Sequence, residues 1–366
     1  MKPRRQAPDF VIFVVTLLLL TIGIIMVLSA SYVFAETRYA DGFYFLKRQL
    51  LWALLGIAGM VTVMKIDYRR FQKWATPFFA LAVILLALVL IPGVGISIKG
   101  SSRWLGAGSL VFQPSEIAKL ALVMFLAKNL ATYPNQIKIF FRGFLPQLMV
   151  VGVICALILA QPDLGTAVAI AGTSYLLFFA AGARKTHLAG LALFGLVLVG
   201  VAIYVAPYRV ERFTAFLNPW ADPLDSGFQT IQSLYAVGSG RLFGMGLGQG
   251  RQKFLYLPEQ HTDFIYAVLS EELGFIGAFF VLLLFFTFMW RGLKIALKAP
   301  DTFGALFATG ITIMVVLQAL INIGVVTGIL PVTGITLPLI SCGGSSLTLN
   351  LLGIGILLNI SQYAGE

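Results

Sequence analysis

The feature that most constrains this chain is a series of long apolar runs. A helix needs about 20 predominantly apolar residues to cross the hydrocarbon core of a bilayer. The runs do not alternate between apolar and polar residues, which excludes a membrane β-barrel. The sequence therefore predicts an all-α polytopic membrane protein that forms a single domain over residues 1–366, with about ten transmembrane helices. These spans cover residues 10–32, 49–66, 75–93, 115–131, 145–160, 164–181, 188–206, 265–290, 303–326 and 337–361.

Composition agrees with this class and excludes several others. The chain is 59% hydrophobic and 11% charged, whereas soluble domains carry about 25% charged residues. Its net charge of +11 comes mostly from short loops between apolar runs, so membrane topology explains it better than nucleic acid does. With two cysteines, Cys155 and Cys342, and two histidines, neither a disulfide framework nor a zinc site is expected. The first run exceeds the usual signal-peptide core of about 7–15 residues, so we expect an uncleaved span.

Lys and Arg in the loops predict the orientation, because cytoplasmic loops carry the excess of these residues. With both termini inside, the inner segments hold fifteen of them: Lys2, Arg4, Arg5, Lys65, Arg69, Arg70, Lys73, Lys128, Lys138, Arg142, Arg184, Lys185, Arg291, Lys294 and Lys298. The short outer segments hold five: Arg38, Lys47, Arg48, Lys99 and Arg103. The count omits residues 207–264, since long loops translocate largely regardless of charge. We therefore expect an N-in, C-in protein with this large extracytoplasmic loop between helices 7 and 8.

The large loop at 207–264 has a composition that argues against disorder. Its stretch FQTIQSLYAVGSGRLFGMGLG is apolar and glycine-rich, which favours a segment that lies on the membrane surface or folds back into the protein. GMGLGQG, residues 244–250, has a glycine spacing like that of nucleotide-binding loops, but no strand precedes it. Backbone that turns sharply or approaches another surface closely is the favoured interpretation.

Ionisable residues within or beside the spans are functional candidates, because charge in a membrane is costly. The fourth span begins QPSEIAKL, where Glu116 and Lys119 share a helix face, and a purely structural ion pair is the alternative. Upstream, Arg103 and Trp104 lie at the outer water line, where a tryptophan is often only an anchor. In QPDLGTA, Asp163 joins the fifth and sixth spans and could simply cap the next helix.

Two further stretches lie at the outer ends of later spans. LPVTGITLPLISCGGSSLTLN, residues 330–350, contains two prolines, three glycines and the pair Ser345 and Ser346, and is expected to break a helix. LPEQHTDFIY, residues 257–266, puts Asp263 at the lip of the eighth span, and Glu271 follows two turns into that span. Asp263 is either a helix cap or a carboxylate that takes part in chemistry.

These candidates share the outer half of the predicted membrane. A secondary transporter would place its site near the midplane, so the crowding suggests a cavity that opens outward. No ATP or sugar nucleotide is present there, so a synthetic enzyme would need a substrate that arrives already activated, such as a lipid-linked pyrophosphate sugar. The candidates are Arg48, Arg103, Glu116, Lys119, Asp163, Asp263, Glu271 and Ser345.

Several motifs resemble those of the SEDS proteins (shape, elongation, division and sporulation), the bacterial peptidoglycan glycosyltransferases of the FtsW/RodA/SpoVE type. The motifs are SSRWLGAGSLVFQPSEIAKL, QPDLGTA, NPWADPLDSGFQTIQSLYAVGSG, GMGLGQGRQKFLYLPEQHTDFIYAVLSEELGFIG and LPVTGITLPLISCGGSSLTLN. The resemblance covers essentially the whole chain, and NPWADPLDSGFQ and LPEQHTDFIYA lean toward the division and sporulation branch. Cys342 stands where the family usually has an aromatic residue, a difference that concerns packing.

The resemblance implies a concrete activity. Members of the family polymerise lipid II, an undecaprenyl-pyrophosphate disaccharide-pentapeptide, into glycan strands at the outer face of the plasma membrane, for cell division, sporulation or cell shape. Their essential acid matches Asp263. The implied partners are a class B penicillin-binding protein, which is a transpeptidase, and other division or spore-cortex proteins, and the implied cofactor is a divalent cation, Mg or Mn, with unknown ligands. The residues expected to bind substrate are Arg48, Arg103, Trp104, Glu116, Lys119, Asp163, Glu271, Ser345 and Ser346.

The chemistry of glycan extension fits these residue types. A sugar 4-hydroxyl must attack an anomeric carbon, and a positioned base such as Asp263 accelerates such a step by about 10²–10⁴-fold. Arg48, Arg103 and Lys119 could offset the charge on the leaving pyrophosphate, with Glu116 holding Lys119. A lipid II flippase is one alternative, but it predicts polar residues that continue to the inner leaflet, and none are aligned in that way. A non-catalytic division scaffold is the other, and it leaves the charged outer helix ends unexplained.

Overall fold

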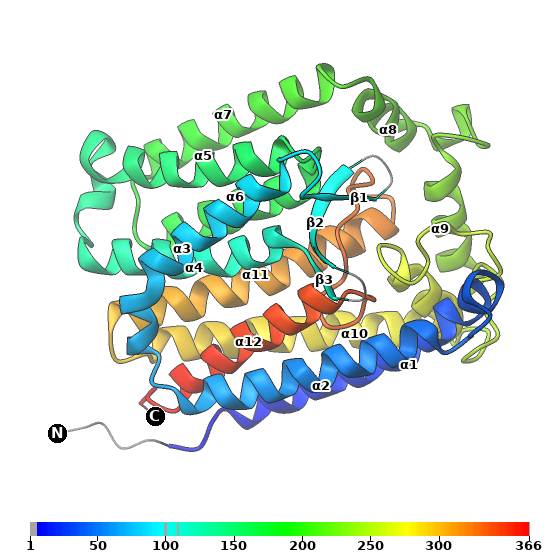
Figure 1. Cartoon of the computed structure of the whole chain (residues 1–366), viewed down its shortest axis with the longest axis horizontal. Coiled ribbons are helices and arrows are strands. Elements are labelled where there is room, and N and C mark those ends of the chain that lie inside the picture. The colour runs from blue at the N-terminus through cyan, green and yellow to red at the C-terminus, as the bar shows by residue number, and fades with distance from the viewer. Residues whose placement is uncertain (1–5, 99–100, 108–109, 366) are drawn as a thin grey trace.

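Long helices that run roughly side by side make up most of the molecule (Figure 1). The computed structural model describes residues 6–98, 101–107 and 110–365, so Lys2, Arg4, Arg5 and Lys99 of the predicted topology lie outside it. The long helices are α1 (Phe10–Tyr39), α2 (Tyr44–Lys65), α3 (Arg69–Val89), α4 (Pro114–Thr132), α5 (Leu145–Leu159), α6 (Leu164–Ala180), α7 (Lys185–Tyr204), α10 (Ile265–Leu297), α11 (Thr302–Val326) and α12 (Gly344–Ser361). Each predicted span overlaps one of these helices.

Length and composition of these helices confirm the polytopic helical class. Within the described residues, eight helical segments are long and apolar enough to cross a bilayer. Two of the ten predicted spans differ, because α6 has 17 residues and α4 carries Glu116, Lys119 and Lys128 among its 19. The figure of ten spans therefore stays a prediction. α4 packs against α3 and α11, so its ionisable groups near the start of the helix face protein.

The helices differ strongly in burial. In the most apolar windows of α11 and α12, 72% and 78% of residues are buried, whereas the corresponding share for α7 is 6%. α11 contacts α4, α6 and α10, and α12 packs along α2. A helix that is apolar all round belongs either in a protein core or in lipid. α11 and α12 thus form the centre of the bundle, and α7 is a peripheral helix that faces lipid.

Both termini lie at one end of the bundle, which we call the terminal end (Figure 1). The Gln6 amide donates to the Gln362 carbonyl over 2.9 Å, and the Asp9 amide donates to Ser361 Oγ over 2.9 Å. These bonds tie the start of the chain to the end of α12.

A small sheet marks the opposite end of the bundle, which we call the sheet end. Its antiparallel strands, in the order β1-β2-β3, are β1 (Ile96–Ile98), β2 (Ser101–Ala107) and β3 (Leu110–Phe112). Trp104 pairs with Ile96 across the first two strands. The sequence predicts no strand here, because pieces of three to seven residues give too short a pattern to distinguish from a loop.

The large loop contains helices of its own at the sheet end. They are α8 (Pro207–Leu217), the 3₁₀ turn η3 (Pro219–Ala221) and α9 (Phe228–Ser239). The NPWADPLDSG motif forms a turn in which Ser226 donates to Asp222 through both its amide and its hydroxyl. These hydrogen bonds hold the pKa of the Asp222 carboxyl below its ordinary value. The expectation that this loop is not disordered is confirmed.

α10 is interrupted at Gly274, where the φ angle is +67°, and part of the loop is inserted at the break. The Glu271 and Glu272 carbonyls accept hydrogen bonds from the Met245 and Gly246 amides, each over 3.0 Å. Just beyond the break, the Phe275 and Ile276 amides donate to carbonyls of the inserted segment, at residues 241 and 242. The loop thereby satisfies backbone groups that a regular helix would have paired internally.

The glycines of GMGLGQG allow this close approach. Gly244, Gly246 and Gly248 all have positive φ angles, and a Cβ atom on Gly244 would lie 2.1 Å from the Glu272 carbonyl oxygen. The interpretation of the motif as backbone that turns sharply and approaches another surface is confirmed.

The last predicted span needs a correction. The sequence predicts a helix over 337–361, but α12 begins only at Gly344, and residues 331–343 are non-helical. Pro331 and Pro338 each remove a backbone donor, which disfavours helix there. We call residues 331–336 the divider, because Pro331, Val332 and Thr333 line one cavity at the sheet end while Gly334, Ile335 and Thr336 line another.

Candidate active site

A buried ion pair forms the centre of the candidate site. Pro114 occupies the first turn of α4, where its missing amide hydrogen costs nothing. Glu116 and Lys119, about one turn apart, then lie on one face of the helix, with 2.8 Å between Lys119 Nζ and Glu116 Oε1. Both side chains are less than one-tenth exposed. The expected pairing of these residues is confirmed.

A second helix fixes the lysine from the other side. Lys119 Nζ donates to Gln318 Oε1 on α11 over 2.6 Å. The Gln318 amide in turn donates to the Thr336 carbonyl over 3.0 Å. A cavity of about 30 Å³ lies here, lined by Gln113, Glu116, Lys119, Thr166, Ala169, Gln318, Gly334, Ile335 and Thr336. We call it the lysine cavity, and it presents one cation on a fixed frame.

Asp263 lies next to the divider, beside a residue that lines the lysine cavity. Gly334, which lines that cavity, has a φ angle of +73°, and a Cβ atom on it would lie 3.5 Å from Asp263 Oδ2. Asn322 on α11 binds both segments of the backbone. Its side-chain amide donates to the carbonyls of Asp263 and Ile335, each over 2.7 Å. The structure thus brings Asp263 close to Gly334, a residue of the divider that lines the same cavity as Glu116 and Lys119.

The alternative role of Asp263, as the cap of the eighth span, finds no support. The residue at the N-cap position of α10 is Phe264, and no side chain makes a capping hydrogen bond from that position. The backbone of Asp263 is anchored through its carbonyl oxygen by Asn322. A half-buried carboxylate at this place is therefore not required to start the helix.

Arg103 and Asp163 meet at the turn between α5 and α6. Arg103 Nη1 lies 3.5 Å from Asp163 Oδ2, and the guanidinium also donates to the carbonyls of Gln161 and Pro162. Asp163 accepts hydrogen bonds from the Thr166 amide and hydroxyl, over 3.0 and 2.9 Å. The capping role foreseen as the alternative for Asp163 is confirmed, while a contact of either residue with substrate stays a prediction.

The remaining candidates are distributed around this centre. Ser345, at the start of α12, accepts from the amide of Gln113, a residue of the lysine cavity, over 3.4 Å. Ser346 accepts from Asn350 one turn later on α12. Arg48 donates to Tyr44 over 2.8 Å. Roles in substrate binding for these residues and for Trp104, which lies on β2, stay predictions.

Glu271 is not among the residues that line the lysine cavity. Its carboxylate is buried and accepts from the amides of Arg251 and Gln252, over 2.8 and 3.2 Å. Its neighbour Glu272 is also buried, pairs with Lys253 Nζ at 2.8 Å and accepts from Ser29 Oγ at 2.7 Å. The two acids attach the inserted loop to α10, and this contact pattern favours a structural role for Glu271 over the expected substrate contact.

Sequence reasoning missed Gln318, Asn322 and Lys253. Gln318 and Asn322 are one turn apart in a span that is otherwise almost wholly apolar. Polar residues inside membrane spans are costly, so this spacing was a usable signal. Lys253 gave none, because it is one of several cations in a polar stretch and its partner, Glu272, is known only from the fold.

The divalent cation implied by the resemblance has no cluster of protein ligands in the part of the chain that the structure covers. Among the described residues, no group of three or more His, Cys, Asp and Glu could hold a metal ion. No described residue is therefore assigned to such an ion.

Comparison with known proteins decides the family. The profile of the FtsW/RodA/SpoVE family, described as cell cycle protein, matches residues 9–366. The chain belongs to this family. It is 53% identical to stage V sporulation protein E of Bacillus subtilis (strain 168) over 364 residues, which covers 100% of both chains. It is 45% identical to the probable peptidoglycan glycosyltransferase FtsW of Geobacter sp. (strain M18), covering 98% of both.

Solved structures give the same answer for the fold. A structure described as showing structural coordination of polymerization and crosslinking by a peptidoglycan synthase complex matches with a TM-score of 0.79 and 31% identity, covering 97% of this chain and 98% of that one. The crystal structure of the rod shape determining protein RodA of Thermus thermophilus matches with a TM-score of 0.73 and 29% identity, covering 98% of both. This FtsW/RodA/SpoVE-family chain is a multi-pass bacterial plasma membrane protein.

Proposed function

We propose that this FtsW/RodA/SpoVE-family chain is a peptidoglycan glycosyltransferase that polymerises lipid II, with Asp263 as the general base. The observation that carries the proposal is the position of the Asp263 carboxylate beside Gly334, on the rim of a cavity that holds the buried cation of Lys119. Supporting it, relatives that match almost the full chain are named probable peptidoglycan glycosyltransferases.

The reaction needs a base and a cation a short distance apart. The 4-hydroxyl of one sugar attacks the anomeric carbon of another and passes its proton to the Asp263 carboxylate. The bond from that carbon to the pyrophosphate oxygen breaks, and the pyrophosphate leaves with the electron pair. A fixed cation at the leaving oxygen stabilises this developing charge without reorganisation. Lys119, held between Glu116 and Gln318, supplies it.

The proposed site also needs to face outward. The described parts of the short segments predicted to be outside lie at the sheet end (Figure 1). The Lys and Arg residues counted in the sequence as inner are the larger group, which supports an outward-facing sheet end. We propose a class B penicillin-binding protein as partner, supported by the similarity to a complex described as coordinating polymerization and crosslinking. The 53% identity to stage V sporulation protein E supports a role in sporulation or division.

A polymerisation assay tests the proposed function. The chain is purified in detergent and given lipid II, with and without the cognate transpeptidase, and the products are separated by size after the lipid is cleaved off. Glycan strands longer than the input disaccharide are expected in at least one of the two conditions. Unchanged lipid II in both conditions, with folded protein, would refute the proposal.

The Glu116–Lys119 pair should act on substrate binding. Lys119→Met alone would leave Glu116 buried without its partner, which is strongly destabilising. The double variant Glu116→Gln/Lys119→Met removes both charges and avoids this. We expect it to fold and to raise the KM for lipid II about tenfold or more, since a hydrogen bond to a charged group contributes about 1.5–3 kcal/mol. Steady-state polymerisation kinetics measure this, and an unchanged KM would remove Lys119 from substrate binding.

A further inference from the structure

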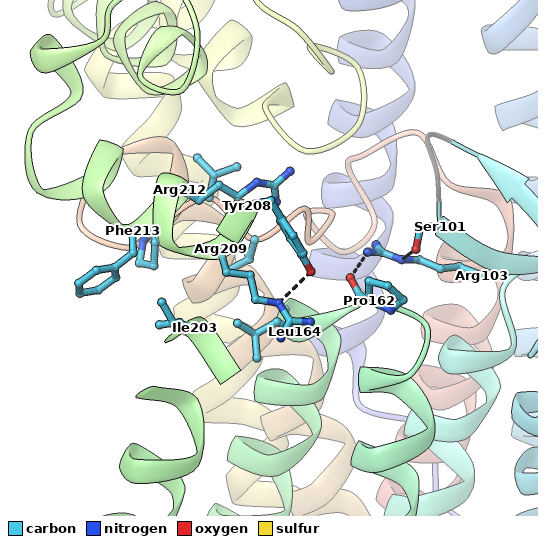
Figure 2. A pocket seen from close by; sticks show the side chains of 13 residues that line it. Ser101, Arg103, Pro162, Leu164, Ile203, Tyr208, Arg209, Arg212 and Phe213 are labelled. Atoms are coloured by element: carbon cyan, nitrogen blue, oxygen red, sulfur yellow. Dashed lines mark hydrogen bonds between the residues drawn. The ribbon is translucent and has the colours of Figure 1, made fainter. Parts of the chain in front are cut away.

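A second and larger cavity lies at the sheet end (Figure 2). It is lined by the first half of the divider, Pro331 to Thr333, whereas the second half, Gly334 to Thr336, lines the lysine cavity. Its volume is about 350 Å³, which falls within the range of about 300–1,000 Å³ typical of small-molecule sites. Its walls come from β2, the start of α6, the end of α7, α8 and the divider, with the lining residues Ser101, Arg103, Pro162, Leu164, Gly165, Ile203, Tyr208, Arg209, Arg212, Phe213, Pro331, Val332 and Thr333. We call it the arginine cavity.

The charge of this cavity is one-sided. Three of its lining residues are arginines, and none of the described lining residues is acidic. Arg103 shares its charge with Asp163 and with two carbonyl groups. Arg209 and Arg212 are one turn apart on α8, on the face that lines the cavity. Neither of these two makes an ion pair with any described residue, so their charge is available to an anion.

Local contacts orient Arg209 toward the cavity. Arg209 Nε donates to the Tyr208 hydroxyl over 2.8 Å, and Nη1 donates to the Ala202 carbonyl over 2.9 Å. Figure 2 shows Tyr208 and Arg209 reaching from α8 toward Pro162 and Arg103 on the opposite wall. The planar guanidinium group suits phosphate oxygens, which it can bind through two parallel hydrogen bonds.

One part of the lining is apolar and adjoins the exposed apolar surface of α7. Leu164, Ile203 and Phe213 line the cavity. Ile203 belongs to the end of α7, whose apolar side chains are exposed over nearly its whole length. A ligand with an anionic head and a long apolar tail therefore fits better than a free anion, because its tail can leave the cavity along α7 into lipid.

The neighbouring site explains why two cavities are needed. If the proposed function holds, each bond that forms joins two lipid-linked saccharides, and each of these brings its own pyrophosphate. Lys119, the cation of the lysine cavity, can offset the negative charge of only one of these two pyrophosphates. The divider contributes Thr333 to the arginine cavity and Gly334, next to Asp263, to the lysine cavity. Two substrates held in the two cavities would therefore lie along the same short segment, with Asp263 next to it.

We propose that the arginine cavity binds the pyrophosphate of a second polyprenyl-linked molecule, with Arg209 and Arg212 as its anion contacts and the prenyl chain lying along α7. This inference rests on the proposed function for the identity of the saccharide, but the recognition of a prenyl diphosphate depends on the cavity alone.

Binding of farnesyl diphosphate, a short soluble prenyl diphosphate, tests the inference independently of catalysis. The purified full chain with Glu116→Gln/Lys119→Met serves as background, because the lysine cavity then lacks its cation. We expect this protein to bind farnesyl diphosphate and the further change Arg209→Gln/Arg212→Gln to weaken binding at least tenfold. The matched control is Arg38→Gln/Arg251→Gln, which removes two exposed cations outside the cavity, and it should leave the affinity unchanged.

Two results in this binding experiment would overturn the inference. One is an affinity that does not change when Arg209 and Arg212 are replaced. The other is farnesol binding as tightly as farnesyl diphosphate, which would mean that only the tail is recognised. A chain that binds the diphosphate through these arginines but makes no glycan would refute the proposed function and leave the cavity assignment intact.

Kinetics on otherwise unchanged protein identify the source of the diphosphate. If a glycan-bearing substrate occupies the cavity, Arg209→Gln/Arg212→Gln should raise the KM for lipid II at least tenfold. If the released carrier occupies it, the same variant should keep its KM and lose at least tenfold in sensitivity to inhibition by added undecaprenyl diphosphate. An active variant that shows neither the higher KM nor the lower sensitivity to undecaprenyl diphosphate would contradict the inference.

Discussion

Asp263→Asn is expected to lower polymerisation by at least about a hundredfold while the protein still folds and reaches the membrane. Asparagine keeps the shape of the side chain but cannot take up the proton of a sugar hydroxyl at neutral pH, and a positioned base contributes about 10²–10⁴-fold. The local backbone should survive the change, because Asn322 holds Asp263 through its carbonyl oxygen. The measurement is the initial rate of glycan formation from lipid II at matched protein concentration.

The control for this experiment is the same substitution at an exposed acid of the same loop. Asp225 is exposed, so Asp225→Asn should retain nearly full activity. Near-normal glycan synthesis by Asp263→Asn would remove the carboxylate from the chemical step. A drop accompanied by loss of thermal stability would indicate a structural role in its place.

Lys253→Met should destabilise the protein by about 3–5 kcal/mol, the usual cost of leaving one member of a buried ion pair alone. Lys253 and Glu272 are both almost fully buried and lie 2.8 Å apart, and Lys253 also donates to Ser29 over 3.0 Å. Without the lysine, the carboxylate keeps hydrogen bonds but loses its counter-charge. We expect a lower unfolding temperature in detergent and faster proteolysis within residues 244–256.

Two companion variants make this result specific. Lys253→Met/Glu272→Gln removes both charges and should regain a large part of the lost stability. Lys47→Met breaks the exposed pair with Asp41 and should change the unfolding temperature little, since exposed pairs contribute little to stability. A double variant as unstable as Lys253→Met alone would show that hydrogen bonding, and not the buried charge, governs this contact.

The sequence predicted the helices well and the irregular backbone poorly. Long apolar runs are a strong signal, and each predicted span overlaps a helix. The break at Gly274 gave no such signal, because a glycine in an apolar run also occurs in unbroken helices and the inserted loop is brought there only by the fold. The non-helical residues 331–343 were expected to break a helix, but their extent depends on side chains such as Gln318 and Asn322 that accept this backbone.

The site was predictable where it is local. Glu116 and Lys119 are one turn apart, so helix geometry alone pairs them, and Asp163 sits where a cap is expected. Contacts between distant segments were not accessible in the same way. Gln318 meets Lys119 across 199 positions of the chain, and Glu271 turned out to accept backbone amides of the loop. The position of a residue in the sequence predicts how deep in the membrane it lies, but not which distant residue it contacts.

The break in α10 also sets how far Asp263 stands from the lipid. The whole helix of 33 residues would be about 50 Å long at 1.5 Å per residue, well beyond the hydrocarbon thickness of about 30 Å. The part after Gly274, residues 275–297, is about 35 Å long, which is enough by itself to cross the hydrocarbon core. With that part in the bilayer, residues 265–273 are a protein-enclosed extension, roughly 14 Å of helix, and would hold the carboxylate beyond the hydrocarbon core, near the sugars of a membrane-anchored saccharide.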